Sequence, residues 1–155
     1  MELHSHADIA AMERLNWWYV ARRGLLANLV HRYAHSCDIA IDVGCGVGSN
    51  YPVLAFCATR VIGLDISADA LAQLRVQYDE TILSAVEKMP FEDNYADIAL
   101  CADVLEHLDD AAATREIYRV LKPGGSLFTR YRHTNLFGMR MMTTRTICAG
   151  IADAS

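Results

Sequence analysis

Five short apolar segments, separated by stretches with helical spacing, limit the fold of this 155-residue chain more than any other feature. Strands that alternate with helices over short connections make right-handed crossovers and pair in parallel, with helices on both faces of the sheet. The sequence therefore predicts a doubly wound α/β domain. The five predicted strands are DIAIDV (38–43), RVIGLD (60–65), TILSAV (81–86), ADIALC (96–101) and SLFTRY (126–131).

The stretches between these strands predict the helices. Apolar residues recur at helical spacing over about 8–34, which indicates one long helix. Pro52 suits the first turn of a short helix, and Ser67 is expected to cap the next one. A further helix is expected over 110–121, before a turn at KPGG (122–125). The helix after Ser67 is expected to carry three side chains on one face, namely Leu71, Leu74 and Tyr78.

A glycine-rich turn, GCGVG, follows the first predicted strand directly. Glycine loses more conformational freedom on folding than any other residue, so Gly44, Gly46 and Gly48 indicate a backbone geometry or a ligand approach that a Cβ would block. Asp65 follows Gly44 by 21 positions and ends the second predicted strand, where its carboxylate can accept hydrogen bonds from a ribose diol. A strand, a glycine turn and this acid together indicate a nucleotide-binding site at the carboxyl ends of the strands.

The spacing of the glycines bears on which nucleotide is bound. A dinucleotide site has the pattern G-x-G-x-x-G, whose third glycine would fall at Ser49. An NAD(P)-binding oxidoreductase is therefore the less favoured alternative. The chain instead has D-x-G-x-G-x-G, in which Asp42 precedes the first glycine by two residues.

That pattern resembles motif I of the class I S-adenosylmethionine (SAM) dependent methyltransferases. VIGLDIS (61–67) is similar to their second motif, and SAVEKMPFEDNYADIALCADVLEHLDD (84–110) and YRVLKPGGSLF (118–128) resemble the type 11, UbiE-like branch. The resemblance implies a Rossmann-like, mostly parallel sheet with strand order 3-2-1-4-5. It also implies a SAM-dependent methyltransferase that acts on a small-molecule acceptor.

The same resemblance implies a set of cofactor-binding residues. The loop would wrap the methionine part of SAM, Asp65 would hold the ribose hydroxyls, and Ile66 would lie against adenine. The family often has Asp where this chain has Ala85, so adenine would rely on the backbone near Val86, at a cost of about 0.5–1.5 kcal/mol for one lost hydrogen bond. The full expected set is Asp42, Gly44, Cys45, Gly46, Gly48, Asp65, Ile66, Ala85, Val86 and Cys101.

No catalytic constellation stands out in the sequence. Methyl transfer from a sulfonium is an in-line displacement, so the protein mainly aligns the reacting atoms in a dry pocket. Asp103 is a weak candidate for a general base, whereas Glu106 and His107 better suit a structural role after strand four. The N-P-P-Y signature of enzymes that methylate base amino groups is missing, since strand four ends in CADV.

The composition argues against some classes of binding partner and bears on the cellular location of the protein. A net charge of −5 argues against a general nucleic-acid surface, and no apolar run reaches about 18 residues, the length a membrane span needs. The five cysteines form no CxxC pair, so neither a disulfide framework nor a metal site is expected. The first residues lack the pattern of a signal peptide, which favours a cytoplasmic location and leaves the oligomeric state open.

The chain is expected to divide into a helix or lid at 1–36, a SAM-binding core at 37–131 and an irregular tail at 132–155 that lacks the usual C-terminal hairpin strands. Strand five would then lie at or near an exposed sheet edge. A reading-frame slip near residue 129 accounts for the tail better than natural divergence, because the shifted frame forces Asp-Asp across 141–143, where the family has His-Asp. A slip would leave a catalytically inactive SAM-binding fragment, which stands as the alternative to an active enzyme.

Overall fold

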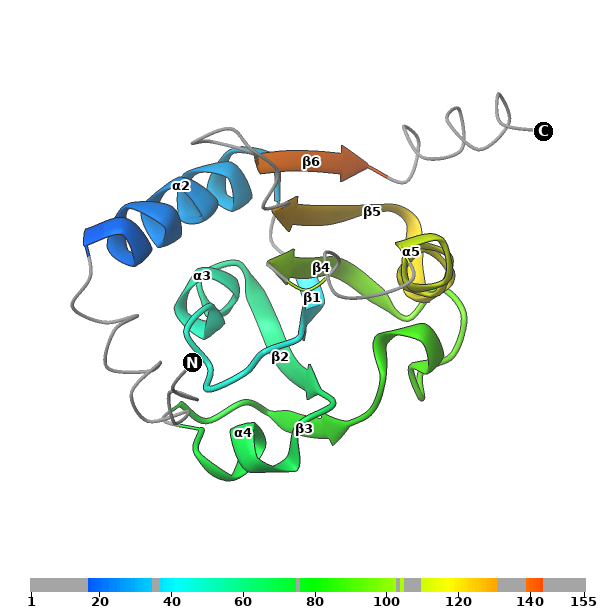
Figure 1. Cartoon of the computed structure of the whole chain (residues 1–155). Helices are drawn as coiled ribbons and strands as arrows, with labels where there is room; N and C mark the ends of the chain where they lie inside the picture. The colour runs from blue at the N-terminus through cyan, green and yellow to red at the C-terminus, as the bar shows by residue number, and fades with distance from the viewer. Residues whose placement is uncertain are drawn as a thin grey trace.

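The structure, a computed structural model, describes residues 17–34, 37–74, 76–102, 104, 110–130 and 139–143. The described strands form one six-stranded sheet (Figure 1). The elements in chain order are α2 (Trp17–Tyr33), β1 (Cys37–Val43), α3 (Tyr51–Ala55), β2 (Ala58–Asp65), α4 (Ala68–Ala72), β3 (Glu80–Leu83), the 3₁₀ turn η1 (Val86–Lys88), β4 (Ala96–Ala102), α5 (Asp110–Val120), β5 (Leu121–Arg130) and β6 (Met139–Thr143).

The sheet has the order β3-β2-β1-β4-β5-β6, and its first five strands pair in parallel. The predicted order 3-2-1-4-5 is confirmed. The chain first moves outward from β1 through β2 to β3, and then crosses to β4 on the other side of β1. The carboxyl end of β1 is therefore the switch point at which sheets of this type bind ligands.

Two apolar clusters cover the two faces of the sheet, because successive strand residues point to opposite faces. On one face α5 and η1 pack over Ile41 and Val43 of β1. On the other face α2 and α3 pack through Leu26, Val30 and Leu54. Figure 1 shows α5 on the opposite side of the sheet from α2 and α3. Helices on both faces, as predicted, thus position the loops at the carboxyl edge.

β6 pairs antiparallel with β5, from Ser126 opposite Thr143 to Arg130 opposite Met139. The sequence predicts strand five at or near an exposed sheet edge; among the described strands β6 forms that edge and β5 lies next to it, so β5 itself is covered. Part of the range expected to be irregular is a strand. An antiparallel neighbour needs no crossover helix, so a chain that turns back can pair with the open backbone groups of β5 without a strong sequence pattern. Residues 131–138 and 144–155 lie outside the described residues.

α4 ends at Ala72, so the prediction of a helix that continues to Tyr78 is wrong. Asp79 gives the reason: its N–H donates to the Val61 carbonyl at 3.0 Å, and its Oδ2 accepts from the Val61 N–H at 2.7 Å. These two bonds hold the chain against β2 instead of in a helix. The predicted cap is confirmed, since the Ser67 hydroxyl accepts from the Ala70 N–H at 3.2 Å.

Other predicted boundaries differ in detail. The KPGG turn lies inside β5 as a bulge, because Ala96 pairs with Leu121 while Ile98 pairs with Ser126. β3 ends at Leu83 rather than at Val86, which opens η1. The long N-terminal helix is seen as α2, and its predicted residues before Trp17 lie outside the described range. No helix of the described residues is long and apolar enough to cross a membrane.

Candidate functional site

The glycine loop joins β1 to α3 at the switch point of the sheet. The N–H groups of Gly44 and Cys45 both donate to the Leu64 carbonyl, at 2.7 and 3.0 Å, which fastens the loop to β2. The Gly48 N–H donates to the Cys45 carbonyl at 2.9 Å, so the chain turns sharply before α3 begins. The loop is held in one shape by its own backbone.

All three loop glycines have left-handed backbone angles, with φ of +72° at Gly44, +53° at Gly46 and +89° at Gly48. An added Cβ would lie 2.2 Å from Val104 Cγ2 at Gly44 and 2.3 Å from Val76 Cγ2 at Gly48. At Gly46 an added Cβ would meet no atom of the described residues within 4 Å. Packing as well as backbone angle therefore requires glycine at two positions, whereas Gly46 faces open space that a ligand can enter.

Asp65 ends β2 and closes the loop from the other side. Its Oδ2 accepts from the Gly46 N–H at 2.7 Å and its Oδ1 from the Ser67 N–H at 2.8 Å. The side chain is half-buried. A carboxylate oxygen has two lone pairs, so each oxygen of Asp65 retains capacity for one more hydrogen bond from a ligand hydroxyl.

Asp42, the first acid of the pattern, is fully buried near the end of β1. Its Oδ2 accepts a hydrogen bond of 2.7 Å from the Tyr78 hydroxyl. Burial raises the pKa of Tyr78, and the adjacent charge of Asp42 raises it further, so Tyr78 is a neutral donor at physiological pH. The loop thus has one acid beneath it and another beside it.

Cys45 lies within the loop and is buried. Burial raises the pKa of its thiol, and the carboxylates of Asp42 and Asp65 raise it further. A protonated, buried thiol is a packing group and not a nucleophile. Its role in the loop is to fill space over β2.

The apolar part of the site lies at the carboxyl ends of β2 and β3. Ile66 is 73% exposed and Leu83 is 59% exposed, which is unusual for large apolar side chains and suits a planar ligand. Ala85, half-buried, precedes η1. The side chains of Val86 and Cys101 point into the core cluster of the α5 face, so any contact from these two residues to a ligand is through their backbone.

The structure brings together most of the predicted residues, and it adds three that the sequence interpretation missed. The sequence pattern predicts Leu83 inside a longer strand and Tyr78 on a helix face. Gly63 went unnoticed, although a glycine inside a strand often marks the close approach of another group. The candidate base Asp103, together with Glu106 and His107, lies outside the described residues.

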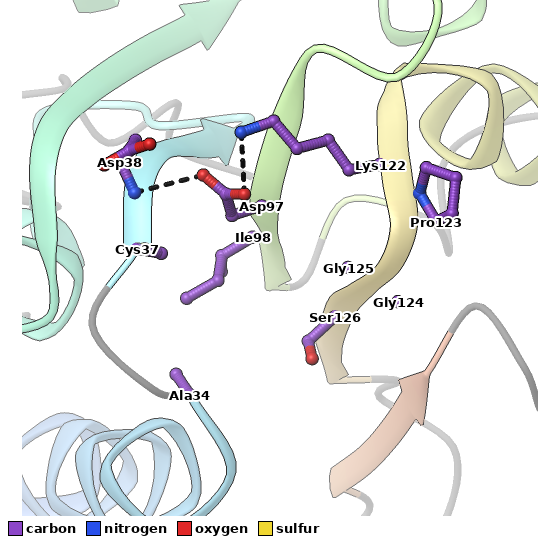
Figure 2. A pocket seen from close by; sticks show the side chains of 10 residues that line it. All are labelled: Ala34, Cys37, Asp38, Asp97, Ile98, Lys122, Pro123, Gly124, Gly125 and Ser126. Carbon is purple, nitrogen blue, oxygen red and sulfur yellow. Dashed lines mark hydrogen bonds and ion pairs between the residues drawn. The ribbon is translucent and has the colours of Figure 1, made fainter.

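A cavity of about 290 Å³ lies at the opposite, amino-terminal edge of the sheet (Figure 2). Asp97 lies in it and accepts from the N–H groups of Asp38 and Ile39 at 3.1 and 3.0 Å and from Lys122 Nζ at 2.8 Å. Burial opposes the charge of Asp97, but these hydrogen bonds outweigh it and hold its pKa below the ordinary value. The polar groups of this cavity bind one another, which ties β1, β4 and β5 together at their starts.

The chain is similar to methyltransferases in both sequence and fold. The family model described as a methyltransferase domain matches residues 41–129. A probable SAM-dependent methyltransferase of Mycolicibacterium smegmatis is 31% identical over 128 residues, which are 81% of this chain and 49% of that protein. The malonyl-[acyl-carrier protein] O-methyltransferase of Yersinia pestis is 30% identical over 133 residues, 81% of this chain and 50% of the relative. The chain thus spans about half the length of these relatives.

Solved structures show the same fold. A candidate SAM-dependent methyltransferase from Methanococcus maripaludis superposes with a TM-score of 0.70 at 23% identity, over 84% of this chain and 67% of the other. The N-methyltransferase NodS from Bradyrhizobium japonicum gives 0.64 at 20% identity, over 74% of this chain and 68% of the other. At these identities the likeness concerns the fold alone.

Proposed function

The chain belongs to the methyltransferase domain family, whose cofactor is SAM, and from this premise we propose that it binds SAM at the glycine loop and transfers the methyl group to a small-molecule acceptor. The finer parts of this proposal are the acceptor class, the roles of the individual residues and turnover by this chain.

The observation that carries the proposal is the charge of the site. Asp42 lies beneath the loop and Asp65 beside it, and the described segments 42–50, 63–67 and 83–86 contain no Lys, Arg or His. SAM carries a sulfonium and an ammonium group, which two carboxylates stabilise. The pyrophosphate of a dinucleotide would be repelled by the same pair. The site therefore suits a cationic nucleoside better than NAD(P).

The residues present fit the cofactor. The open space at Gly46 admits the ligand to the backbone of the loop. Asp65 has the spare acceptor capacity that ribose hydroxyls need, and the exposed side chains of Ile66 and Leu83 offer apolar surface to adenine. Ala85 supplies no side-chain acceptor, so the adenine amino group depends on backbone carbonyls.

When bound, SAM supplies a methyl group on a sulfonium that leaves readily. The work left to the chain is to orient the cofactor and to exclude water, which the fixed loop and the apolar surface do. Among the described residues of the site no side chain is placed as a general base, and Asp103 keeps that role as a proposal. An acceptor with a loosely held proton needs no base.

Ser49 disfavours the oxidoreductase alternative, because a dinucleotide site has glycine at that position. One other spacing in the sequence would favour it. Tyr118 and Lys122 have the Tyr-x-x-x-Lys spacing of some hydride-transfer sites. Lys122, however, binds Asp97 in the cavity at the amino-terminal edge of the sheet (Figure 2). The glycine loop lies at the opposite, carboxyl ends of the strands. This pair is not placed to act on a nucleotide at the loop.

We propose a cytoplasmic location because none of the four described cysteines forms a disulfide. The division at residues 36/37 and 131/132 stays a prediction. α2 packs against α3 in the same apolar cluster as β1, which supports treating the helix and the core as one folded unit.

Calorimetric titration with SAM, S-adenosylhomocysteine (SAH) and NAD(H) tests the proposal. We expect both SAM and SAH to bind and NAD(H) to give no heat. Binding of NAD(H) alone would contradict the assignment. Incubation with methyl-labelled SAM and a panel of small carboxylic acids, phenols and amines then tests turnover: binding without labelled product would support the inactive-fragment alternative.

A further inference from the structure

A missing side chain on β2 creates a space beside the buried acid. Gly63 of β2 pairs in register with Asp42 of β1, so the two positions are neighbours on the same face of the sheet. The backbone of Gly63 is not left-handed, and its conformation alone does not require glycine. An added Cβ would lie 3.1 Å from the ring of Tyr78 and 3.1 Å from Cys45 Sγ. Close packing against Tyr78 and Cys45, and not the backbone conformation, therefore favours glycine here.

Tyr78 fills this space from outside the sheet. It is 6% exposed, its ring lies over Gly63, and its hydroxyl reaches Asp42 Oδ2 at 2.7 Å, the length of a charge-assisted bond. The neighbouring Asp79 holds this segment in place through its two hydrogen bonds to Val61. The Tyr78 hydroxyl is therefore held in a fixed position against the Asp42 carboxylate.

We propose that Tyr78 is the positioning residue of the cofactor site: it orients the Asp42 carboxylate so that this charge acts on the ammonium end of SAM. This inference rests on the proposed SAM site and adds a residue to it. Asp42 lies in β1 two residues before Gly44 and pairs with Gly63, whereas Asp65 ends β2 and binds the loop at Gly46. Because Asp65 is assigned to the ribose, the inference assigns Asp42 to the amino-acid end of the cofactor, so Tyr78 acts on that end and leaves the nucleoside end unaffected.

A variant of Tyr78 that lacks only the hydroxyl separates the orienting role of this residue from simple packing. Tyr78→Phe keeps the ring over Gly63 and removes only the hydroxyl. SAH contains the amino-acid end, whereas 5′-deoxy-5′-methylthioadenosine has the same nucleoside without it. We expect the variant to bind SAH about tenfold more weakly, as for the loss of one charge-assisted hydrogen bond, and to bind methylthioadenosine within about twofold of the wild type.

Tyr51→Phe is the matched control, because the Tyr51 ring contacts that of Tyr78 edge-on with centroids 5.0 Å apart. This control should leave both affinities unchanged. Equal losses for both ligands in Tyr78→Phe would assign the residue to packing and overturn the inference. Unchanged SAH affinity would also overturn it. If the wild type itself binds no SAH, the proposed function fails, which is a distinguishable result.

A wild-type measurement covers the case in which Tyr78→Phe does not fold. With carbon-13 in the tyrosine Cζ position, the Tyr78 resonance reports the state of its hydroxyl. We expect this resonance to shift when SAH is added and to stay in place with methylthioadenosine. A resonance that moves equally with both ligands, or with neither, contradicts the proposal.

Discussion

Replacement of Gly46 by alanine has two expected effects: backbone strain, which lowers stability, and a methyl group in the ligand space, which lowers cofactor affinity. Gly46 has φ of +53°, and no atom of the part of the chain that the structure describes lies within 4 Å of the position where a Cβ would point. An L-residue in the left-handed region costs about 1–2 kcal/mol. For a chain of this size, that cost corresponds to a fall in Tm of about 2–8 °C.

Gly124 provides the matched control. It also has a left-handed φ, +84°, and an added Cβ there would meet no described residue within 4 Å, but it lies in the β5 bulge beside the amino-terminal cavity. Gly124→Ala should lower Tm by a similar amount. Only Gly46→Ala adds a methyl group in the space assigned to the cofactor, where overpacking by about 1–3 kcal/mol weakens binding roughly 5- to 150-fold.

The assay is calorimetric titration of SAH into both variants and the wild type, with thermal unfolding of each. We expect similar losses of Tm and a loss of SAH affinity in Gly46→Ala alone. SAH affinity that is unchanged in Gly46→Ala, or lowered equally in Gly124→Ala, would refute the reasoning that the open space over Gly46 is cofactor space.

Three further predictions concern single side chains. Asp65→Ala should weaken SAH about 10- to 150-fold, because a charge-assisted acceptor is lost; an unchanged Kd in calorimetry would remove Asp65 from the site. The hydrogen bond from Cys37 lowers the pKa of the Cys57 thiol, whereas burial raises the pKa of the Cys45 thiol. Iodoacetamide at neutral pH should therefore alkylate Cys57 before Cys45. Peptide mass spectrometry reads the order of alkylation, and the reverse order would contradict this prediction. Because the folded-state pKa of Asp97 is depressed, its stabilisation is present above its unfolded pKa of about 4 and is lost as the pH falls below that value. Asp97→Asn should therefore lower the free energy of unfolding by about 1 kcal/mol near pH 7, with a difference that shrinks in acid and no change in SAH affinity; a constant difference across pH would contradict it.

The parallel part of the fold is predictable from the sequence because its signals are local. Each buried strand is a short apolar run, and the residues that end β1 and β2 carry the glycine pattern and Asp65. Strand order then follows from the family resemblance. The left-handed angles at the three loop glycines agree with the expectation of a special backbone geometry.

The parts that could not be predicted depend on contacts between distant residues. Tyr78 looks like a helical residue until Asp79 is seen bonded to Val61, and its partner Asp42 is 36 positions away. β6 has no strand periodicity of its own and is defined by pairing with β5. Cys37 and Cys57 come together only because the starts of β1 and β2 pair, with the Cys37 N–H donating to the Cys57 carbonyl at 3.0 Å.

An NMR titration of the nitrogen-15-labelled chain with SAH tests the central claim most directly, since it locates the ligand. The account predicts that amide resonances of 44–48 and of Asp65 and Ile66 shift together and saturate with one Kd. Resonances around Asp97 and Lys122, at the opposite edge of the sheet, should stay in place. Shifts confined to that opposite edge, or no shifts at all, would contradict a SAM site at the glycine loop.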